Sequence, residues 1–126
     1  MDDVQEKPTF KDLDNLTKEI FVLNLRIYEG HNSLNFLKDT LVLTQLRMSA
    51  EVAAEKTEDG KKKFSNEDQR QVEVKKRLSE QTNYYQAEVH IKEEEYELKL
   101  MEIRLQYLRD KLTNLRLFLQ GEKNGQ

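Results

Sequence analysis

The sequence contains no cysteine and no tryptophan, and only one proline and four glycines among its 126 residues. The lack of cysteine excludes disulfide frameworks, cysteine-based zinc sites and thiol catalysis. Apolar runs are only a few residues long, so no segment is predicted to span a membrane. The start of the chain is acidic (Asp2, Asp3, Glu6), unlike a secretory signal, and we therefore expect a cytoplasmic protein.

Groups that carry enzyme chemistry are also scarce. The only histidines, His31 and His90, lie among polar neighbours, and neither belongs to a metal-ligating spacing such as H-E-x-x-H. The run Glu93–Glu95 could suggest a cation site, but adjacent helical residues point in different directions, so Glu93 and Glu95 are interpreted as part of a solvated face. Glu94 falls on the apolar stripe described below and is interpreted as a polar residue that sets register. We expect no catalytic residue, no metal site and no cofactor, and therefore no enzyme.

Charged and apolar residues are both abundant, at 36% and 37% of the chain. This composition is typical of long helices and coiled coils, and it predicts an all-α protein. An apolar stripe whose steps alternate between three and four residues begins at Leu13 and ends at Met48, with only Gly30 and Thr44 lacking a large apolar group. We interpret it as one helix over residues 11–54, bent at Gly30. Two helices joined by a tight turn at residues 29–33 are the alternative.

A second helix is predicted over residues 65–119, a stretch without glycine or proline. Ser65 and Asp68 have the capping-box spacing, and Gly121 is the expected stop. Residues of the same alternating spacing form its stripe: Ile91, Leu98, Met101, Leu105, Leu108, Leu112, Leu115 and Leu119.

The turn dipeptide Asp59-Gly60 lies in a polar segment, residues 55–64, between the two predicted helices. It predicts a single domain over residues 9–120, folded as a long antiparallel helical hairpin or coiled coil, with tails at residues 1–8 and 121–126. The second helix carries a further apolar row: Tyr96, Leu100, Ile103 and Tyr107. A two-helix hairpin cannot cover this row, so we expect it to be the interface of a homo-oligomeric bundle.

Positive charge gathers around the turn. Between Lys56 and Arg77 there are eight basic and five acidic residues, in a chain with a net charge of -3. The basic residues are Lys56, Lys61, Lys62, Lys63, Arg70, Lys75, Lys76 and Arg77. Lysines in a loop can contact phosphates as point charges, so we predict that this tip binds nucleic acid. A solubilising turn is the alternative. Tyr84 and Tyr85 are interpreted as helix-packing residues rather than base-stacking ones.

The string Asp59-Gly60 followed by Phe64-Ser65, and then Glu73, Lys75, Leu78 and Ser79, resembles the centre of UvsY-type recombination mediators of T-even phages. The resemblance implies a small helical phage protein that forms ring-shaped oligomers, binds single-stranded DNA and helps to load a recombinase. It covers residues 59–79. The family has its DNA-contacting Lys and Arg near the end of the first helix, where residues 50–56 offer only Lys56.

Two functional hypotheses follow. The first is a non-enzymatic accessory protein that binds single-stranded DNA through the basic tip, with a recombinase or another protein as a further partner. The second is a protein-binding coiled-coil module, such as a phage assembly chaperone or an inhibitor, with no nucleic-acid role. The surplus apolar row favours the second, and the basic tip favours the first.

Overall fold

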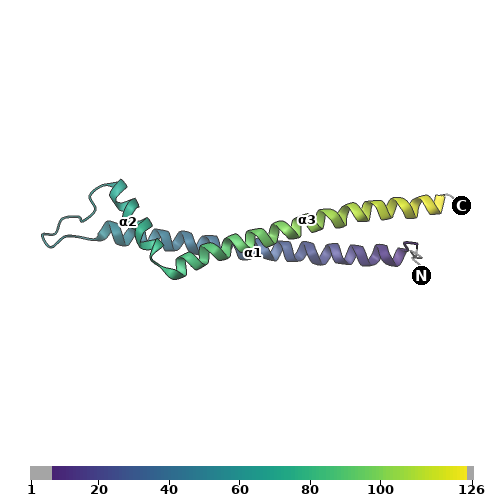
Figure 1. Ribbon diagram of the computed structural model, residues 1–126, viewed down its shortest axis with the longest axis horizontal. Helices are drawn as coiled ribbons and strands as arrows, with labels where there is room; N and C mark the ends of the chain where they lie inside the picture. The colour runs from purple at the N-terminus through teal and green to yellow at the C-terminus, as the bar shows by residue number, and fades with distance from the viewer. Residues whose placement is uncertain (1–6, 125–126) are drawn as a thin grey trace, which may run out of the picture. The chain divides into compact units, whose positions relative to one another are not determined.

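A computed structural model describes residues 7–124 of the chain as an all-α structure with three helices (Figure 1). They are α1 (Phe10–Ala54), α2 (Glu67–Ser79) and α3 (Thr82–Asn124). The all-α prediction is confirmed. No helix in this part of the chain is both long and apolar enough to cross a membrane. The chain divides into two compact units, Met1–His31 with Glu97–Gln126 and Asn32–Tyr96, and both long helices contribute to each unit.

Helix α1 begins at a reciprocal cap and continues through Gly30. The Thr9 N–H donates to Asp12 Oδ2 at 2.7 Å, and the Asp12 N–H donates to Thr9 Oγ1 at 3.4 Å. Gly30 is helical, so the alternative of two helices with a turn here is wrong. A Cβ on Gly30 would lie 2.6 Å from Leu98 Cδ2. Glycine at this position therefore allows the buried Leu98 to approach the backbone closely.

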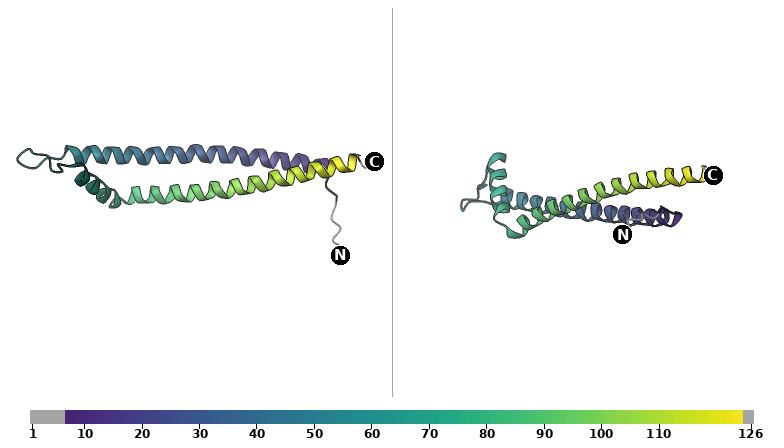
Figure 2. Two further views of the ribbon diagram at one scale, coloured as in Figure 1. Left: turned by 90° about the horizontal axis from the view of Figure 1, so that it is seen from above. Right: turned by 45° about the vertical axis from the view of Figure 1, so that its right-hand side comes forward.

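In the first unit, α1 and α3 lie side by side and run in opposite directions (Figure 2). Lys7 contacts Glu122 at 3.4 Å, and Glu19 contacts Arg104 at 2.9 Å. The core of this unit consists of residues from the predicted stripes: Leu16, Leu23, Leu105 and Leu108, with Ile20, Ile27, Met101, Leu112 and Leu115 packed against them. The alternating spacing therefore identified the buried face of both helices.

The second unit has its own small core where α2 packs against the end of α1. Met48, Val52 and Leu78 are buried there, and Val52 is 0% exposed. Phe64, Val74 and Tyr84 pack around them. These contacts hold α2 against α1, so the helix departs from the direction of α3 (Figure 2).

The predicted single helix over residues 65–119 is wrong, because the structure divides it between α2 and α3 at Glu80 and Gln81. A straight helix would place Leu78 in phase with Tyr85 and Tyr96, both of which are exposed. The break instead returns Leu78 to the core beside Met48 and Val52. Burying a leucine contributes about 1.5–3 kcal/mol, enough to offset one or two lost helical hydrogen bonds at about 0.5–1.5 kcal/mol each.

Two predicted helix ends are also displaced. Asn66 caps α2 instead of Ser65, since the Gln69 N–H donates to Asn66 Oδ1 at 2.8 Å. Helix α3 continues through Gly121, where a stop was expected, and buries Leu119 near its end. A single glycine costs a helix only about 1 kcal/mol, which packing can offset. Of the predicted tails, residues 1–6 and 125–126 lie outside the described residues, and 121–124 are helical.

The buried stripe should dominate the stability of the first unit. Leu108 is 2% exposed, so Leu108→Ala removes packed methyl groups and leaves a cavity. We expect it to lower the free energy of unfolding by about 2–5 kcal/mol in urea titrations at fixed protein concentration. The control is Glu97→Ala, an exposed position of the same helix, which should change stability by less than about 0.5 kcal/mol. Equal losses in the two variants would contradict the assignment of the buried face.

Candidate nucleic-acid interface

Residues 55–66, named here the lysine loop, connect α1 to α2 and fold into a short two-stranded ribbon. Lys56 and Lys62 form an antiparallel bridge. The Thr57 N–H donates to the Lys61 carbonyl at 2.7 Å, and the Lys63 N–H donates to the Glu55 carbonyl at 3.0 Å. The Gly60 N–H closes the turn on the Thr57 carbonyl at 2.9 Å, with Gly60 at a φ of 82°. The Asp59-Gly60 signal therefore marks a hairpin turn whose left-handed position is taken by glycine.

The ribbon fixes where its lysines lie. Bridge partners project from the same face of a ribbon, so Lys56 and Lys62 are neighbours, while Lys61 and Lys63, on either side of Lys62 in the strand, both project from the opposite face. All four lysines are exposed. Within residues 7–124, none of the four contacts a carboxylate at ion-pair distance. Like charges directly opposite each other are destabilising, and a bound anion would relieve that repulsion.

Lys63 also contacts the one aromatic ring of the loop. Its ammonium lies 5.6 Å from the centre of the Phe64 ring, and the Arg77 guanidinium lies 5.9 Å from the same ring. Both distances suit cation–π attraction. Phe64 is half-buried against the small core of the second unit, so it connects the exposed lysines to the packed part of that unit.

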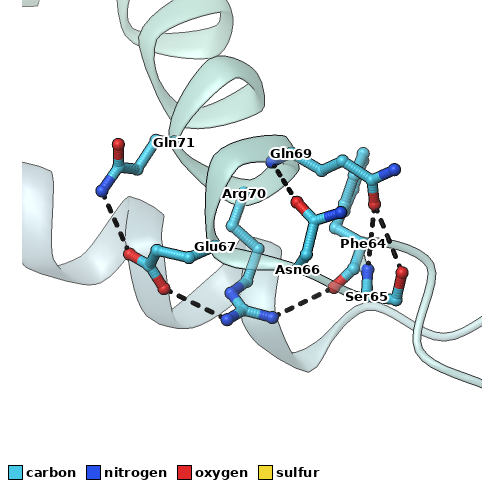
Figure 3. A network of polar contacts seen from close by, with 7 residues as sticks. All are labelled: Phe64, Ser65, Asn66, Glu67, Gln69, Arg70 and Gln71. Carbon is cyan, nitrogen blue, oxygen red and sulfur yellow. Dashed lines mark hydrogen bonds and ion pairs between the residues drawn. The ribbon is translucent and has the colours of Figure 1, made fainter.

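Arg70, predicted to contact nucleic acid, instead makes hydrogen bonds within the chain at the start of α2 (Figure 3). Its guanidinium donates to the Phe64 carbonyl at 3.3 Å and to Glu67 Oε2 at 3.1 Å. Glu67 also accepts from the Gln71 amide at 3.2 Å, and these two partners lower the pKa of its carboxyl. Arg70 therefore holds the end of the lysine loop to the first turn of α2, which is a structural role.

Arg77 also forms ion pairs within the chain. Its guanidinium pairs with Glu55 at the end of α1 and with Glu73 one turn earlier in α2, the latter at 3.0 Å. The hydrogen bonds that its guanidinium donates to Glu55 and Glu73 raise the pKa of Arg77. The pair with Glu55 joins the first residue of the lysine loop to the last turn of α2, so Arg77 fastens α2 beside the end of α1. The i, i+4 spacing of Glu73 and Arg77 could have revealed one partner, but the contact with Glu55 depends on the fold.

Lys75 and Lys76, the remaining predicted contacts, are exposed on α2. Lys75 lines a cleft of about 790 Å³ in the second unit, between α1, α2 and the start of α3. Ala50, Val74 and Leu78 supply apolar lining to the same cleft. The structure thus gathers four lysines on the lysine loop, leaves two on α2, and assigns Arg70 and Arg77 to internal pairs.

The two tyrosines differ in their surroundings. Tyr84 packs against the core of the second unit, and the Gln45 side-chain amide donates to its hydroxyl at 2.6 Å. Tyr85 is 63% exposed, so the packing role expected for it is not seen within the chain.

Each histidine has a carboxylate neighbour. The partner of His90 is four residues away in the same helix, whereas the partner of His31 is distant in sequence and could not be predicted from spacing. His31 Nε2 lies 3.2 Å from Glu102 Oε1 across the first unit, and His90 Nε2 lies 3.9 Å from Glu94 Oε1. Glu94 is half-buried on the stripe. Among residues 7–124, no group of three or more metal-ligating side chains comes together.

With this geometry in view, the chain was compared with known proteins. Family models, curated proteins and solved structures gave no match. The function is therefore argued from the residues themselves.

The Glu67 network makes a pH prediction. We expect the Glu67 carboxyl to titrate below its ordinary pKa of 4.5, and Arg70→Ala to return it toward that value, by carbon-detected NMR. Because the pKa is lowered in the folded chain, the stabilisation is present above 4.5 and is lost as the pH falls through the folded value. An unchanged Glu67 titration in the Arg70→Ala chain would contradict the pairing.

Proposed function

We propose that this protein is a cytoplasmic, non-enzymatic accessory protein that binds single-stranded nucleic acid through its lysine loop and acts as a homo-oligomer. The chain is further proposed to form an antiparallel coiled-coil hairpin that assembles into a helical bundle. The observation that carries the proposal is the set of exposed lysines on one short ribbon, including Lys56 directly opposite Lys62.

The chemistry of the loop suits a phosphate backbone. Lysine ammonium groups act as mobile point charges, and phosphate contacts carry no sequence information. The loop therefore favours binding without sequence preference. The resemblance of residues 59–79 to UvsY-type mediators makes single-stranded DNA the first nucleic acid to test, and a recombinase the first protein partner. Tyr85, exposed at the start of α3, is available for stacking on a base.

Oligomerisation would bring several lysine loops into one assembly and so multiply their weak phosphate contacts. Tyr96, Leu100, Ile103 and Tyr107, the predicted interface residues, are all exposed, from 44% for Leu100 to 64% for Tyr96. Large apolar side chains in a continuous exposed row are typical of an interaction surface. Each added copy contributes another lysine loop, so several weak phosphate contacts combine into useful avidity.

The lysine loop predicts a steep salt dependence. Binding to single strands changes with a log–log slope of about -0.7 per neutralised phosphate, so three lysines contribute about -2 per engaged chain. Lys61→Ala, Lys62→Ala and Lys63→Ala together should flatten the slope by that amount, measured by fluorescence anisotropy with oligo-dT.

The matched control replaces Lys11, Lys99 and Lys111 by alanine, which changes net charge equally at positions outside the lysine loop. This control should keep most of the wild-type slope. If both triple variants behaved alike, the loop would have no special role. A wild-type chain without affinity even at low salt would reject nucleic-acid binding altogether.

The apolar row of α3 makes a separate prediction. Leu100→Lys combined with Ile103→Lys places charge on the exposed row and should lower the mass measured by light scattering, while circular dichroism remains helical. The control, Glu95→Lys combined with Thr113→Lys, uses exposed positions about 80° or more around α3 from the row and should leave the mass unchanged. A monomeric wild-type chain at micromolar concentration would contradict self-association.

A protein-binding module without a nucleic-acid role is the second candidate. The exposed apolar row favours it, because such a row can receive a helix of another protein as well as a second copy. The two candidates differ in their response to salt: apolar contacts are insensitive to it, whereas phosphate contacts weaken steeply.

A further inference from the structure

Helix α1 carries an exposed apolar strip in the first unit, on the side opposite its buried stripe. The strip consists of Phe21, Leu25 and Tyr28, of which Phe21 is 68% and Leu25 47% exposed. Leu25 stands two residues from the buried Leu23, about 200° around the helix. The strip therefore faces away from α3, and the packing within the unit cannot cover it.

Helix α3 has the same arrangement in this unit. Leu100, Ile103 and Tyr107 are exposed, and Ile103 stands two residues from the buried Leu105. This second strip faces away from α1. Each chain thus presents two apolar strips on opposite sides of one pair of helices.

The two strips lie at the same level of the unit. The Glu19–Arg104 ion pair, at 2.9 Å, and the close approach of Leu98 to Gly30 join the two helices within this region. Since the helices are antiparallel, Phe21 lies level with Tyr107, and Tyr28 with Leu100. One further turn along the strips stand Lys18 on α1 and, on α3, Asp110 with Lys111 next to it.

We propose that the α1 strip of one copy packs against the α3 strip of a second copy, antiparallel and in register. Phe21 then meets Tyr107, Leu25 meets Ile103, and Tyr28 meets Leu100. Lys18 meets Asp110 at the edge of the contact. The inference rests on the proposed self-association and identifies the surface that covers the α3 row.

The positions of the charges and the burial of both strips favour this pairing over pairings of two α1 strips or two α3 strips. Parallel pairing of two α1 strips brings Lys18 against Lys18, and parallel pairing of two α3 strips brings Asp110 against Asp110. Antiparallel self-pairing sets Lys18 opposite Asn32 and Asp110 opposite Tyr96, so neither charge meets an opposite one. Only the mixed pairing buries both strips and joins opposite charges. It is head-to-tail, so chains add to form a ring if the rotation between copies closes and an open filament if it does not.

Within the chain, Lys18 contacts Asp14 at 3.0 Å, and Asp110 accepts from Gln106 at 3.0 Å. Both contacts are on the surface, where such interactions contribute little and are readily exchanged. They leave Lys18 and Asp110 able to meet across an interface.

Cysteine cross-linking tests the pairing directly, because the natural chain has no cysteine. Chains carrying Leu25→Cys are mixed with chains carrying Ile103→Cys, unfolded and refolded together, and then oxidised. We expect disulfide-linked dimers in the mixture and few in either variant alone. Arg26→Cys mixed with Arg109→Cys, at exposed positions outside the strips, is the control and should remain uncross-linked.

The other outcomes overturn the inference in recognisable ways. Cross-linking of Ile103→Cys with itself, in chains of oligomeric mass, would leave self-association standing and replace the pairing by one between α3 strips. Cross-linking of Leu25→Cys with itself would indicate α1 pairing instead. A monomeric mass without cross-links would reject both the pairing and the proposed self-association.

Charge reversal supplies an independent readout. Lys18→Glu should raise the dissociation constant of the oligomer by about 2–5-fold at low salt, the effect of an exposed ion pair. Adding Asp110→Lys to the same chain should return the dissociation constant to the wild-type value. Failure of the double variant to recover, with each single variant weakened, would contradict contact between these two side chains.

Discussion

Burial of one narrow apolar stripe on each long helix is the interaction on which the rest of this structure depends. In the first unit, Leu16 and Leu23 of α1 pack against Leu105 and Leu108 of α3. Two helices cannot bury more than this contact, because only one side of each faces the other. Apolar residues outside the stripes, such as Phe21, Leu25 and Ile103, remain exposed, so the outer faces are where a partner can bind.

The same requirement for burial explains the shape of the second unit. Val74 and Leu78 of α2 are out of phase with the stripe of α3, and a break at Glu80 lets them reach the core around Val52. Once α2 is docked, Arg77 reaches Glu55 and fastens the base of the lysine loop. Hydrophobic packing therefore positions the cations, and the ion pairs then fix the loop in place.

The cations around the loop have separate roles for a chemical reason. The planar guanidinium of Arg70 or Arg77 can donate to two acceptors at once, which suits it to hold carboxylates and carbonyls within the fold. The ammonium of lysine is strongly hydrated and stands on a flexible stem, which suits contact with a mobile polyanion. The proposed interface is therefore smaller than the full set of basic residues, and it consists of lysines.

The sequence alone determined α1, the buried faces of α1 and α3, and the turn at Gly60. These features depend on local spacing and on the conformations open to single residues. The division into α2 and α3, and the pairing of Arg77 with Glu55, required the tertiary structure. Each depends on a contact between residues distant in sequence: Leu78 with Val52 in one case, and residues 22 positions apart in the other. The need for glycine at position 30 also depends on a tertiary contact, since Leu98 occupies the space that a side chain would fill.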